Sequence, residues 1–208
     1  MQTIHSATAT PFNGFYAGVL AGAVRNTLKG ELAVESTTLK AKNGHHITGF
    51  LYGLMAGYGQ NLNGFYLGAE IGIQSDTTNK SKKYTYSASG DEAEIKAKYQ
   101  RGPAFTIAPR FGVIFSGSYM AYFKPSLEIS KDKTTVSDSD GDSESSKKKL
   151  KCVFAPGVGL EKAFLNNLLL RVEYAYSLGS KTKVSDDNTS HSVKYSSHAV
   201  KVGVAYQF

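Results

Sequence analysis

Apolar and polar residues alternate along this chain with a period of two. Over 65–74, the odd-numbered positions are apolar and carry Phe65, Leu67, Ala69, Ile71 and Ile73. The even-numbered positions carry Tyr66, Gly68, Glu70, Gly72 and Gln74. A strand turns successive side chains to opposite faces, whereas a helix repeats about every 3.6 residues. The pattern therefore predicts strands, each with one apolar and one polar face.

An internal repeat supports this interpretation. The segment NGFYAGVLAG at 13–22 returns as NGFYLGAEIG at 63–72. Each copy begins with Asn-Gly, which marks a turn, and the interval suits a repeated β-hairpin with its connections. No stretch approaches the roughly 18 consecutive apolar residues that a membrane-spanning helix needs, so helical insertion is excluded.

The alternation defines eight segments, each long enough, at about 9 to 11 residues, to cross a bilayer at a tilt. They lie at 14–25, 46–59, 64–75, 103–115, 119–130, 151–162, 167–178 and 198–208. Short connections alternate with long polar ones at 26–45, 76–102, 131–150 and 179–197. This asymmetry is typical of outer-membrane barrels. We predict an all-β fold: a transmembrane eight-stranded antiparallel up-and-down β-barrel with short periplasmic turns and four long extracellular loops.

The charges separate once each segment is given two faces. The apolar face, taken as the outward one, carries no charged residue in the central part of the eight segments. The opposite face carries four acids and four bases, namely Glu70, Arg110, Lys124, Glu128, Glu161, Arg171, Glu173 and Lys201. An Arg or Lys that faces lipid at the bilayer midplane costs about 2 to 4 kcal/mol. We therefore expect an apolar exterior and a charged interior.

Glycine and proline refine this expectation. The inward face is rich in glycine, and eight strands enclose room for side chains and little more, so we expect a filled interior. Pro109, Pro125 and Pro156 fall within predicted strands. Proline lacks a backbone donor, and a closed barrel has no free edge to accommodate it. We expect bulges or strand ends at these three positions.

Composition excludes several classes of protein. The net charge is +7, but the lysine-rich stretches around 79–101 and 130–151 are interleaved with acids, which indicates solvated loops and no nucleic-acid partner. The single Cys152 excludes an internal disulfide and a cysteine-based zinc cluster. Residues 1–12 have neither a basic start nor an apolar core. We interpret 1–12 as a tail, a remnant of a signal peptide, and 13–208 as the barrel domain.

Four motifs carry a resemblance to a known group: the repeated GFYxGxxxG, PRFG at 109–112, VFAPGVGLEKAFLNNLLLRVEYAYS at 153–177 and the terminal VGVAYQF. They resemble the small eight-stranded outer-membrane barrels, namely the transmembrane domain of outer-membrane protein A and the opacity and surface-antigen porin families. The resemblance implies an interior network of acids and bases at Glu70, Lys124 and Glu173, with Arg110 and Arg171 nearby. We add Glu128 to this network. The resemblance also implies that Tyr206 and Phe208 form a terminal signal read by the barrel-assembly machinery.

Other candidate sites are weaker. His45, His46, His191 and His198 flank two of the long connections, and they are more consistent with solvated loop residues than with metal ligands. The run DSDGDSE at 138–144 has alternate oxygen ligands but lacks the glycine placement and distal acid of a calcium loop. No nucleophile stands beside a base at a recognisable spacing. We expect no enzyme activity, cofactor or metal.

Two functions fit a barrel of this kind. The first is a monomeric bacterial outer-membrane surface protein, a structural barrel that anchors exposed loops for adhesion or for interaction with host or envelope. Its partners are outer-membrane lipid, lipopolysaccharide and a host-surface ligand of the loops. The second is a narrow porin-like channel for ions or small solutes. A third interpretation, a soluble calycin-like barrel with the apolar face inward, leaves a surface too rich in glycine and too poor in charge for water.

Overall fold

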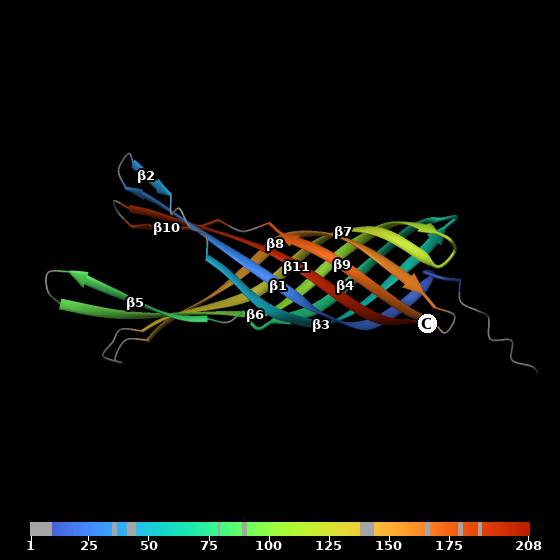
Figure 1. Ribbon diagram of the computed structural model, residues 1–208, viewed down its shortest axis with the longest axis horizontal. Coiled ribbons are helices and arrows are strands. Elements are labelled where there is room, and N and C mark those ends of the chain that lie inside the picture. The colour runs from blue at the N-terminus through green and yellow to red at the C-terminus, as the bar shows by residue number, and fades with distance from the viewer. Residues whose placement is uncertain are drawn as a thin grey trace, which may run out of the picture.

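The computed structural model describes the backbone of most of the chain, and strands make up nearly all of it (Figure 1). The described residues are 10–34, 37–40, 45–78, 80–88, 91–137, 144–164, 167–178, 181–186 and 189–208. Side chains are described at 10–27, 46–78, 102–131, 150–164, 167–178 and 196–208. Within these ranges, no helix is long and apolar enough to cross a membrane.

Eight of the described strands close into a barrel. They are β1 (Gly14–Val34), β3 (His45–Leu62), β4 (Phe65–Asp76), β6 (Asp91–Phe115), β7 (Tyr119–Ser137), β8 (Glu144–Ala163), β9 (Leu168–Ser177) and β11 (Thr189–Gln207). Each pairs antiparallel with the next in chain order, and β1 pairs with β11 to close the wall. The prediction of an all-β, eight-stranded antiparallel barrel is confirmed.

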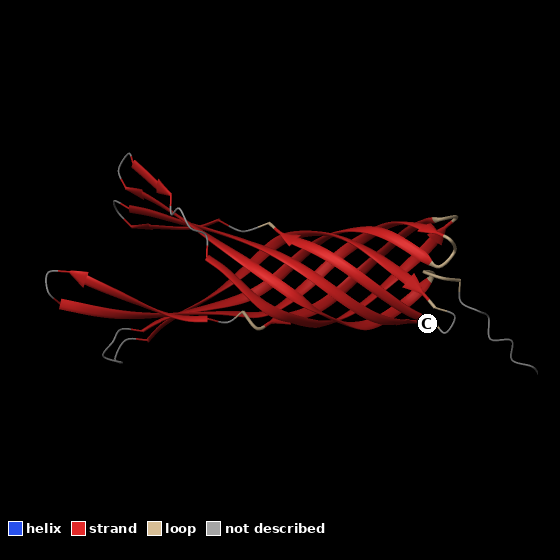
Figure 2. Cartoon of the chain, viewed as in Figure 1, coloured by secondary structure: helices blue, strands red, loops and turns tan. Residues whose placement is uncertain are grey.

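Six of the eight barrel strands, all except β4 and β9, are longer than the sequence pattern predicted. Three short strands, β2 (Thr37–Lys40), β5 (Lys80–Ala88) and β10 (Lys181–Asp186), fold back on extensions of β1, β6 and β11. Figure 2 shows these hairpins projecting beyond one end of the barrel, which we call the hairpin end; we call the opposite end the turn end. The predicted long loops are therefore largely strand. Backbone pairing continues past the apolar band, where both faces can be polar and the two-residue hydrophobic pattern disappears.

The two faces of the wall lie as predicted. The apolar face is outside: Phe15 is 66 % exposed, Leu54 is 59 % exposed and Phe208 is 69 % exposed. The charged face is inside, where Arg110 is fully buried. The barrel is thus apolar outside and ionic inside, the arrangement that a lipid environment favours.

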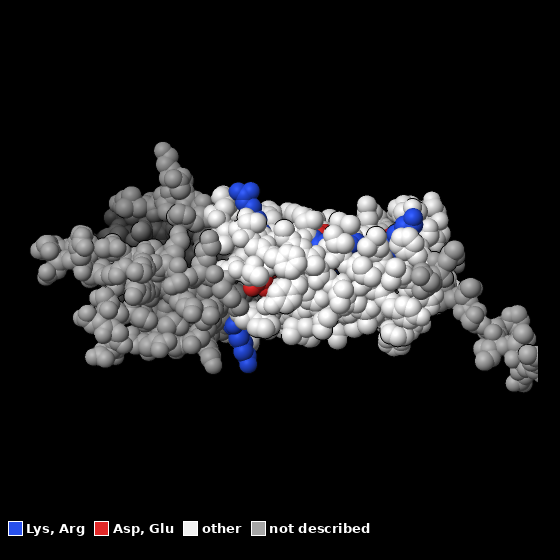
Figure 3. Space-filling view, turned by 60° about the horizontal axis from the view of Figure 1, so that its bottom comes forward, with Lys and Arg blue, Asp and Glu red and all other residues white. Residues whose placement is uncertain are grey.

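Two bases depart from this separation. Arg25 and Lys162 belong to the predicted segments 14–25 and 151–162, and both lie on the outward face, one at each end of the barrel. Figure 3 shows the same distribution on one side of the molecule, with blue side chains standing out near the ends of a mostly white surface. Long basic side chains can lay their alkyl stems on apolar surface while the charge reaches the interface.

Two prolines interrupt the wall without shifting its register. The pairing of β6 with β7 runs from Ile107↔Leu127 directly to Phe111↔Phe123, and it omits the residues around Pro109 and Pro125. Both pairs have the same register, so the expectation of a bulge at these two positions is wrong. Proline has no N–H to donate, and the ladder loses its bonds locally instead.

The remaining irregularities lie nearby. Pro156 stands opposite Pro125 in the β7–β8 pairing, and the pairing of β8 with β9 stops one residue away at Gly157, which agrees with a ladder that ends at proline. The register shift of β6 falls between Arg101 and Ala104. That position is beside Pro103, a proline that the sequence analysis did not single out.

The N-terminal residues close the turn end of the barrel. Phe12 is buried in an apolar cluster with Tyr66, Met120 and Leu169. Its backbone N–H donates to Gln207 Oε1 at 2.9 Å, and Gln207 Nε2 donates to the carbonyls of residues 10 and 13 at 2.9 and 2.8 Å. Phe12 therefore packs as part of the barrel, one residue before the predicted domain boundary. Residues 1–9 of the predicted tail lie outside the described residues.

Replacing Gln207 by alanine should lower the free energy of unfolding by roughly 1 to 3 kcal/mol, because three hydrogen bonds of about 1 kcal/mol each are lost. The measurement is urea unfolding in detergent micelles, followed by heat-modifiable migration on gels. Gln60→Ala is the matched control, because Gln60 is exposed, and it should change stability by less than about 0.5 kcal/mol. Equal effects of the two substitutions would contradict a stabilising role of the Gln207 hydrogen bonds.

Candidate functional site: an interior charge network

Six strands direct charged side chains into the middle of the barrel. Glu70 comes from β4, Arg110 from β6, Lys124 from β7, Glu161 from β8, Arg171 and Glu173 from β9, and Lys201 from β11 lies above them. All seven are buried. Each follows and precedes a residue that faces outward, so the two-residue period that builds the apolar exterior also delivers these groups to one interior space.

Glu70 is the centre of the network. Lys124 Nζ lies 3.0 Å from its Oε1, and Arg110 Nη1 lies 3.7 Å from its Oε2. Arg171 Nη1 also contacts Oε2, and the Tyr16 hydroxyl donates to the same oxygen at 2.9 Å. One carboxylate is therefore held by three cations and a hydroxyl group. Removing it would leave three buried charges without their shared partner.

Two further carboxylates extend the network. Glu161 Oε2 lies 3.0 Å from Arg110 Nη2 and 2.8 Å from Arg171 Nε, although the latter N–H is not aligned for a hydrogen bond. Glu173 lies 2.5 Å from Lys124 Nζ and 3.2 Å from Lys201 Nζ. Acids and bases thus alternate across the barrel interior. Such pairing offsets the large cost of removing each charge from water.

Three tyrosines surround the fully buried guanidinium of Arg110. Its Cζ lies 5.6, 5.3 and 4.1 Å from the ring centroids of Tyr16, Tyr66 and Tyr122. A guanidinium over an aromatic face gains cation–π attraction, most of all where water is absent. The Tyr122 hydroxyl also donates to Glu173 at 3.0 Å. The tyrosines therefore fill space and bind charge at the same time.

Glycines on the inward face make room for these rings. A Cβ added at Gly159 would lie 2.5 Å from the Tyr122 ring, and one added at Gly57 would overlap the Tyr16 hydroxyl. Gly59 and Gly68 stand against Tyr66 in the same way. The glycine-rich lumen is thus filled by neighbouring side chains, as expected for eight strands.

The structure brings together five of the six predicted network residues: Glu70, Arg110, Lys124, Arg171 and Glu173. The sixth, Glu128, lies closer to the hairpin end and accepts hydrogen bonds from Gln74 Nε2 at 2.8 Å and Ser177 Oγ at 3.3 Å. The predicted network did not include Glu161 and Lys201, although both were assigned to the inward face. The tyrosines were missed as well; a tyrosine on the glycine-rich face is the signal that would have found them.

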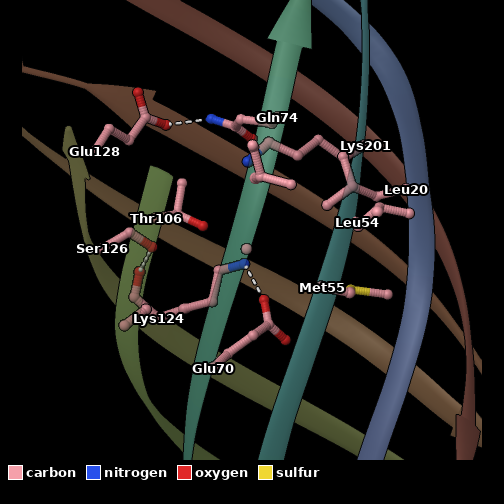
Figure 4. Close-up of a pocket in the computed structure, with 13 residues that line it drawn as sticks. Leu20, Leu54, Met55, Glu70, Gln74, Thr106, Lys124, Ser126, Glu128 and Lys201 are labelled. Carbon is pink, nitrogen blue, oxygen red and sulfur yellow. Dashed lines mark hydrogen bonds and ion pairs between the residues drawn. The ribbon is translucent and has the colours of Figure 1, made fainter. Parts of the chain in front are cut away.

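A small polar cavity separates Glu128 from the network. Figure 4 shows Glu70, Lys124 and Lys201 at its border, with Gln74 bonded to Glu128 across it. It has room for about one water molecule, and its polar walls suit one. The interior is therefore tightly filled at the network, with room for about one water molecule above it.

The other predicted sites are dispersed. His46 lies 3.1 Å from the Thr27 hydroxyl, and His198 lies on the outward face opposite Arg25, two residues from Thr27 in the register of β1. The side chains of His45 and His191, and the acidic run at 138–143, lie outside the described residues. Among the described residues, no three His, Cys, Asp or Glu side chains gather as a metal site would require.

The terminal aromatics lie on the outward face. Tyr206 and Phe208 are both exposed, and their rings pack edge to face with centroids 5.3 Å apart. The N–H of Phe208 donates to the carbonyl of Phe15 at 2.8 Å, which joins the last residue to the first strand. Recognition of this pair by the assembly machinery remains a prediction.

A closed antiparallel wall that is apolar outside and ion-paired inside defines an integral outer-membrane β-barrel protein. The chain belongs to the family described as outer membrane protein beta-barrel domain, which matches residues 2–208. It is 32% identical over 164 residues to the 31 kDa outer-membrane immunogenic proteins of Brucella melitensis and Brucella suis, covering 77% of this chain and 67% of each relative. The protein therefore resides in the bacterial outer membrane.

Solved outer-membrane proteins align with nearly the whole chain at low sequence identity. The outer-membrane protease OmpT of Escherichia coli aligns over 98% of this chain and 99% of its own, with 10% identity and a TM-score of 0.52. Neisserial surface protein A aligns over 94% of this chain and 98% of its own, with 17% identity and a TM-score of 0.46. At such identities the likeness to OmpT is a likeness of fold alone.

Glu70→Ala should destabilise the barrel by about 3 to 5 kcal/mol, because it removes one side of a buried ion network. Urea unfolding in phospholipid vesicles measures the change. Lys162→Gln, which alters a charge on the outer face near Tyr119 and Phe164, should cost less than about 0.5 kcal/mol. A Glu70→Ala barrel as stable as the parent would show that the network contributes nothing to folding.

Proposed function

We propose that this protein is a non-conducting surface module, in which the barrel is a rigid membrane anchor and the hairpins bind ligands of the host or of the bacterial envelope. Outer-membrane barrels place short turns in the periplasm and long connections outside, so the hairpin end faces the surroundings. The name of the Brucella relatives, immunogenic proteins, supports exposure at the cell surface.

The filled interior carries the proposal. Arg110 is wholly buried between Tyr16, Tyr66 and Tyr122, and Glu70 and Glu161 bind it from two sides. An ion passing through would have to displace these groups and break their pairs. A barrel built for transport would not be expected to block its axis with an ion network, whereas an anchor benefits from one.

The hairpins supply the second part of the argument. The extended strands continue past the apolar band, and polar surface loops are where binding concentrates. The β5 hairpin contains KSKK at 80–83, and the start of β8 contains KKKLK at 147–151. Lysine clusters favour anionic ligands such as sulfated glycans or lipopolysaccharide.

The closed wall has no free edge for pairing with another copy, so the active unit proposed is a monomer.

A narrow ion channel is the second candidate, and the polar cavity favours it. The cavity beside Lys124 and Lys201 has room for about one water molecule, and the layer around Glu70 and the apolar cluster of Phe12 separate it from the turn end. Catalysis has no part in either role, since Glu70, Glu161 and Glu173 are engaged by basic partners.

Binding to a sulfated glycan surface should fall at least about tenfold when the β5 hairpin, 80–99, is replaced by a short turn, because its lysines contact the ligand. Surface plasmon resonance on immobilised heparin measures the loss. Added salt should also weaken the binding of the parent protein to heparin. The control replaces the β10 hairpin, 181–194, with the same turn. Undiminished binding by both variants, or none by the parent protein, would contradict this ligand class.

Planar-bilayer recording tests the anchor against the channel. The parent protein should give no reproducible conductance, because Glu70 and its partners block the interior. Glu70→Gln, which keeps the shape and removes the charge, should also remain silent. Steady unitary currents from the parent protein that change with Glu70→Gln would overturn the anchor and establish the channel.

A further inference from the structure

Where side chains are described, the outward face carries charge only at its two ends, and this charge is all basic. Among outward residues with described side chains, the charged ones are Arg25, Lys131 and Lys162, while the described acids lie on the inward face. Lys162 lies over the Tyr119 and Phe164 rings at the turn end. Arg25 and Lys131 lie at the hairpin end. Bases without acidic partners on a lipid-facing surface indicate an anion supplied by the lipid.

Arg25 lies at the level of the lipid head groups. It follows Phe15 by ten residues on the same face of β1, and ten residues of strand rise about 33 Å. At a tilt of roughly 40° this spans about 25 Å, the height of the apolar band of such barrels. The outward residues between them, Ala17, Val19, Ala21 and Ala23, are uncharged. Arg25 is therefore the first outward charge beyond the hydrocarbon.

A second basic group stands directly across from Arg25. His198 on β11 is its register partner, and Thr48 on β3 is its partner on the other side. All three side chains are exposed. Side chains directly opposite in an antiparallel pair have Cβ atoms about 4.5 to 5.5 Å apart. A guanidinium, an imidazole and a hydroxyl group thus converge on one patch of the outer wall, which we call the Arg25 patch.

The His198 ring is held in place by two tyrosines. Tyr174 Oη lies 2.7 Å from His198 Nδ1, and the Tyr176 ring packs against the imidazole with centroids 4.7 Å apart. The bond at Nδ1 leaves Nε2 as the ring nitrogen that can meet a ligand. Tyrosines are favoured at the membrane interface, where one end of the ring is apolar and the other is hydrated. The ring is therefore oriented before any ligand arrives.

We propose that the Arg25 patch binds a phosphate group of lipopolysaccharide, the glycolipid of the outer leaflet. Guanidinium binds phosphate oxygens through paired, charge-assisted hydrogen bonds. The Thr48 hydroxyl supplies a further donor, and so does Nε2 of His198 when Nδ1 accepts from the Tyr174 hydroxyl. Below the patch, Ala23, Phe50 and Val200 face outward, where acyl chains of the same lipid would contact them. The proposal uses the barrel orientation given above but not the ligand of the hairpins.

Native mass spectrometry of the barrel released from detergent micelles tests the proposal with bisphosphorylated lipid A as the probe. The parent protein should retain at least about tenfold more lipid A than the Arg25→Gln/His198→Gln variant, since charge-assisted bonds are lost. Lys162→Gln should retain as much as the parent protein, because Lys162 lies at the turn end. Heat-modifiable migration confirms that each variant is folded.

Two further probes identify the source of the phosphate. Lipid A without phosphate should bind the parent protein and the double variant equally. Inorganic phosphate at the same concentration should not displace lipid A from the parent protein. Equal retention of bisphosphorylated lipid A by parent and double variant, equal loss in Lys162→Gln, or displacement by inorganic phosphate would each overturn the proposal.

Discussion

Hydrocarbon offers no hydrogen bonds, and this constraint governs the whole molecule. Each unpaired backbone group in the bilayer core costs several kcal/mol, so a wall of strands must close on itself. The pairing of β1 with β11 achieves this closure. The terminal aromatic, the buried Phe12 and the bonds of Gln207 all gather at this one junction. Phe12 and the end of β11 are therefore joined where the barrel would otherwise open.

The need for an apolar, lipid-facing exterior determines which residues the interior can contain. Because alternate residues must be apolar to face lipid, the residues between them are free to be polar, and the barrel radius leaves no room for bulk water around them. Lys124 and Arg171 resolve this conflict by pairing with the carboxylate of Glu70. The same groups that fold the barrel also obstruct it. In the anchor proposed above, stability and closure to solutes would therefore depend on the same groups.

Sequence alone predicted the parts of the structure that depend on the period of two. Strand number, the outward face and the buried positions of Glu70, Arg110 and Glu173 all follow from that alternation. It could not predict that Arg110 pairs with Glu161 as well as with Glu70, since partners across a barrel depend on shear and side-chain length. It also missed the strand extensions beyond the membrane, where no apolar face is required. Phe12 was missed because a single buried residue before a turn has no periodicity to reveal it.

The proline interruption lies at a particular place in the wall. In the order of pairing, β6 and β7 are the fourth and fifth of eight barrel strands, so their junction is diametrically opposite the closing pair β1 and β11. The cylinder thus consists of two four-stranded shells, joined along a continuous ladder on one side and along a ladder interrupted at Pro109 and Pro125 on the other. Lateral pressure from the bilayer would bend such a body along the interrupted line first. We therefore expect the mechanical compliance of the barrel to have a direction, which Pro109 and Pro125 determine.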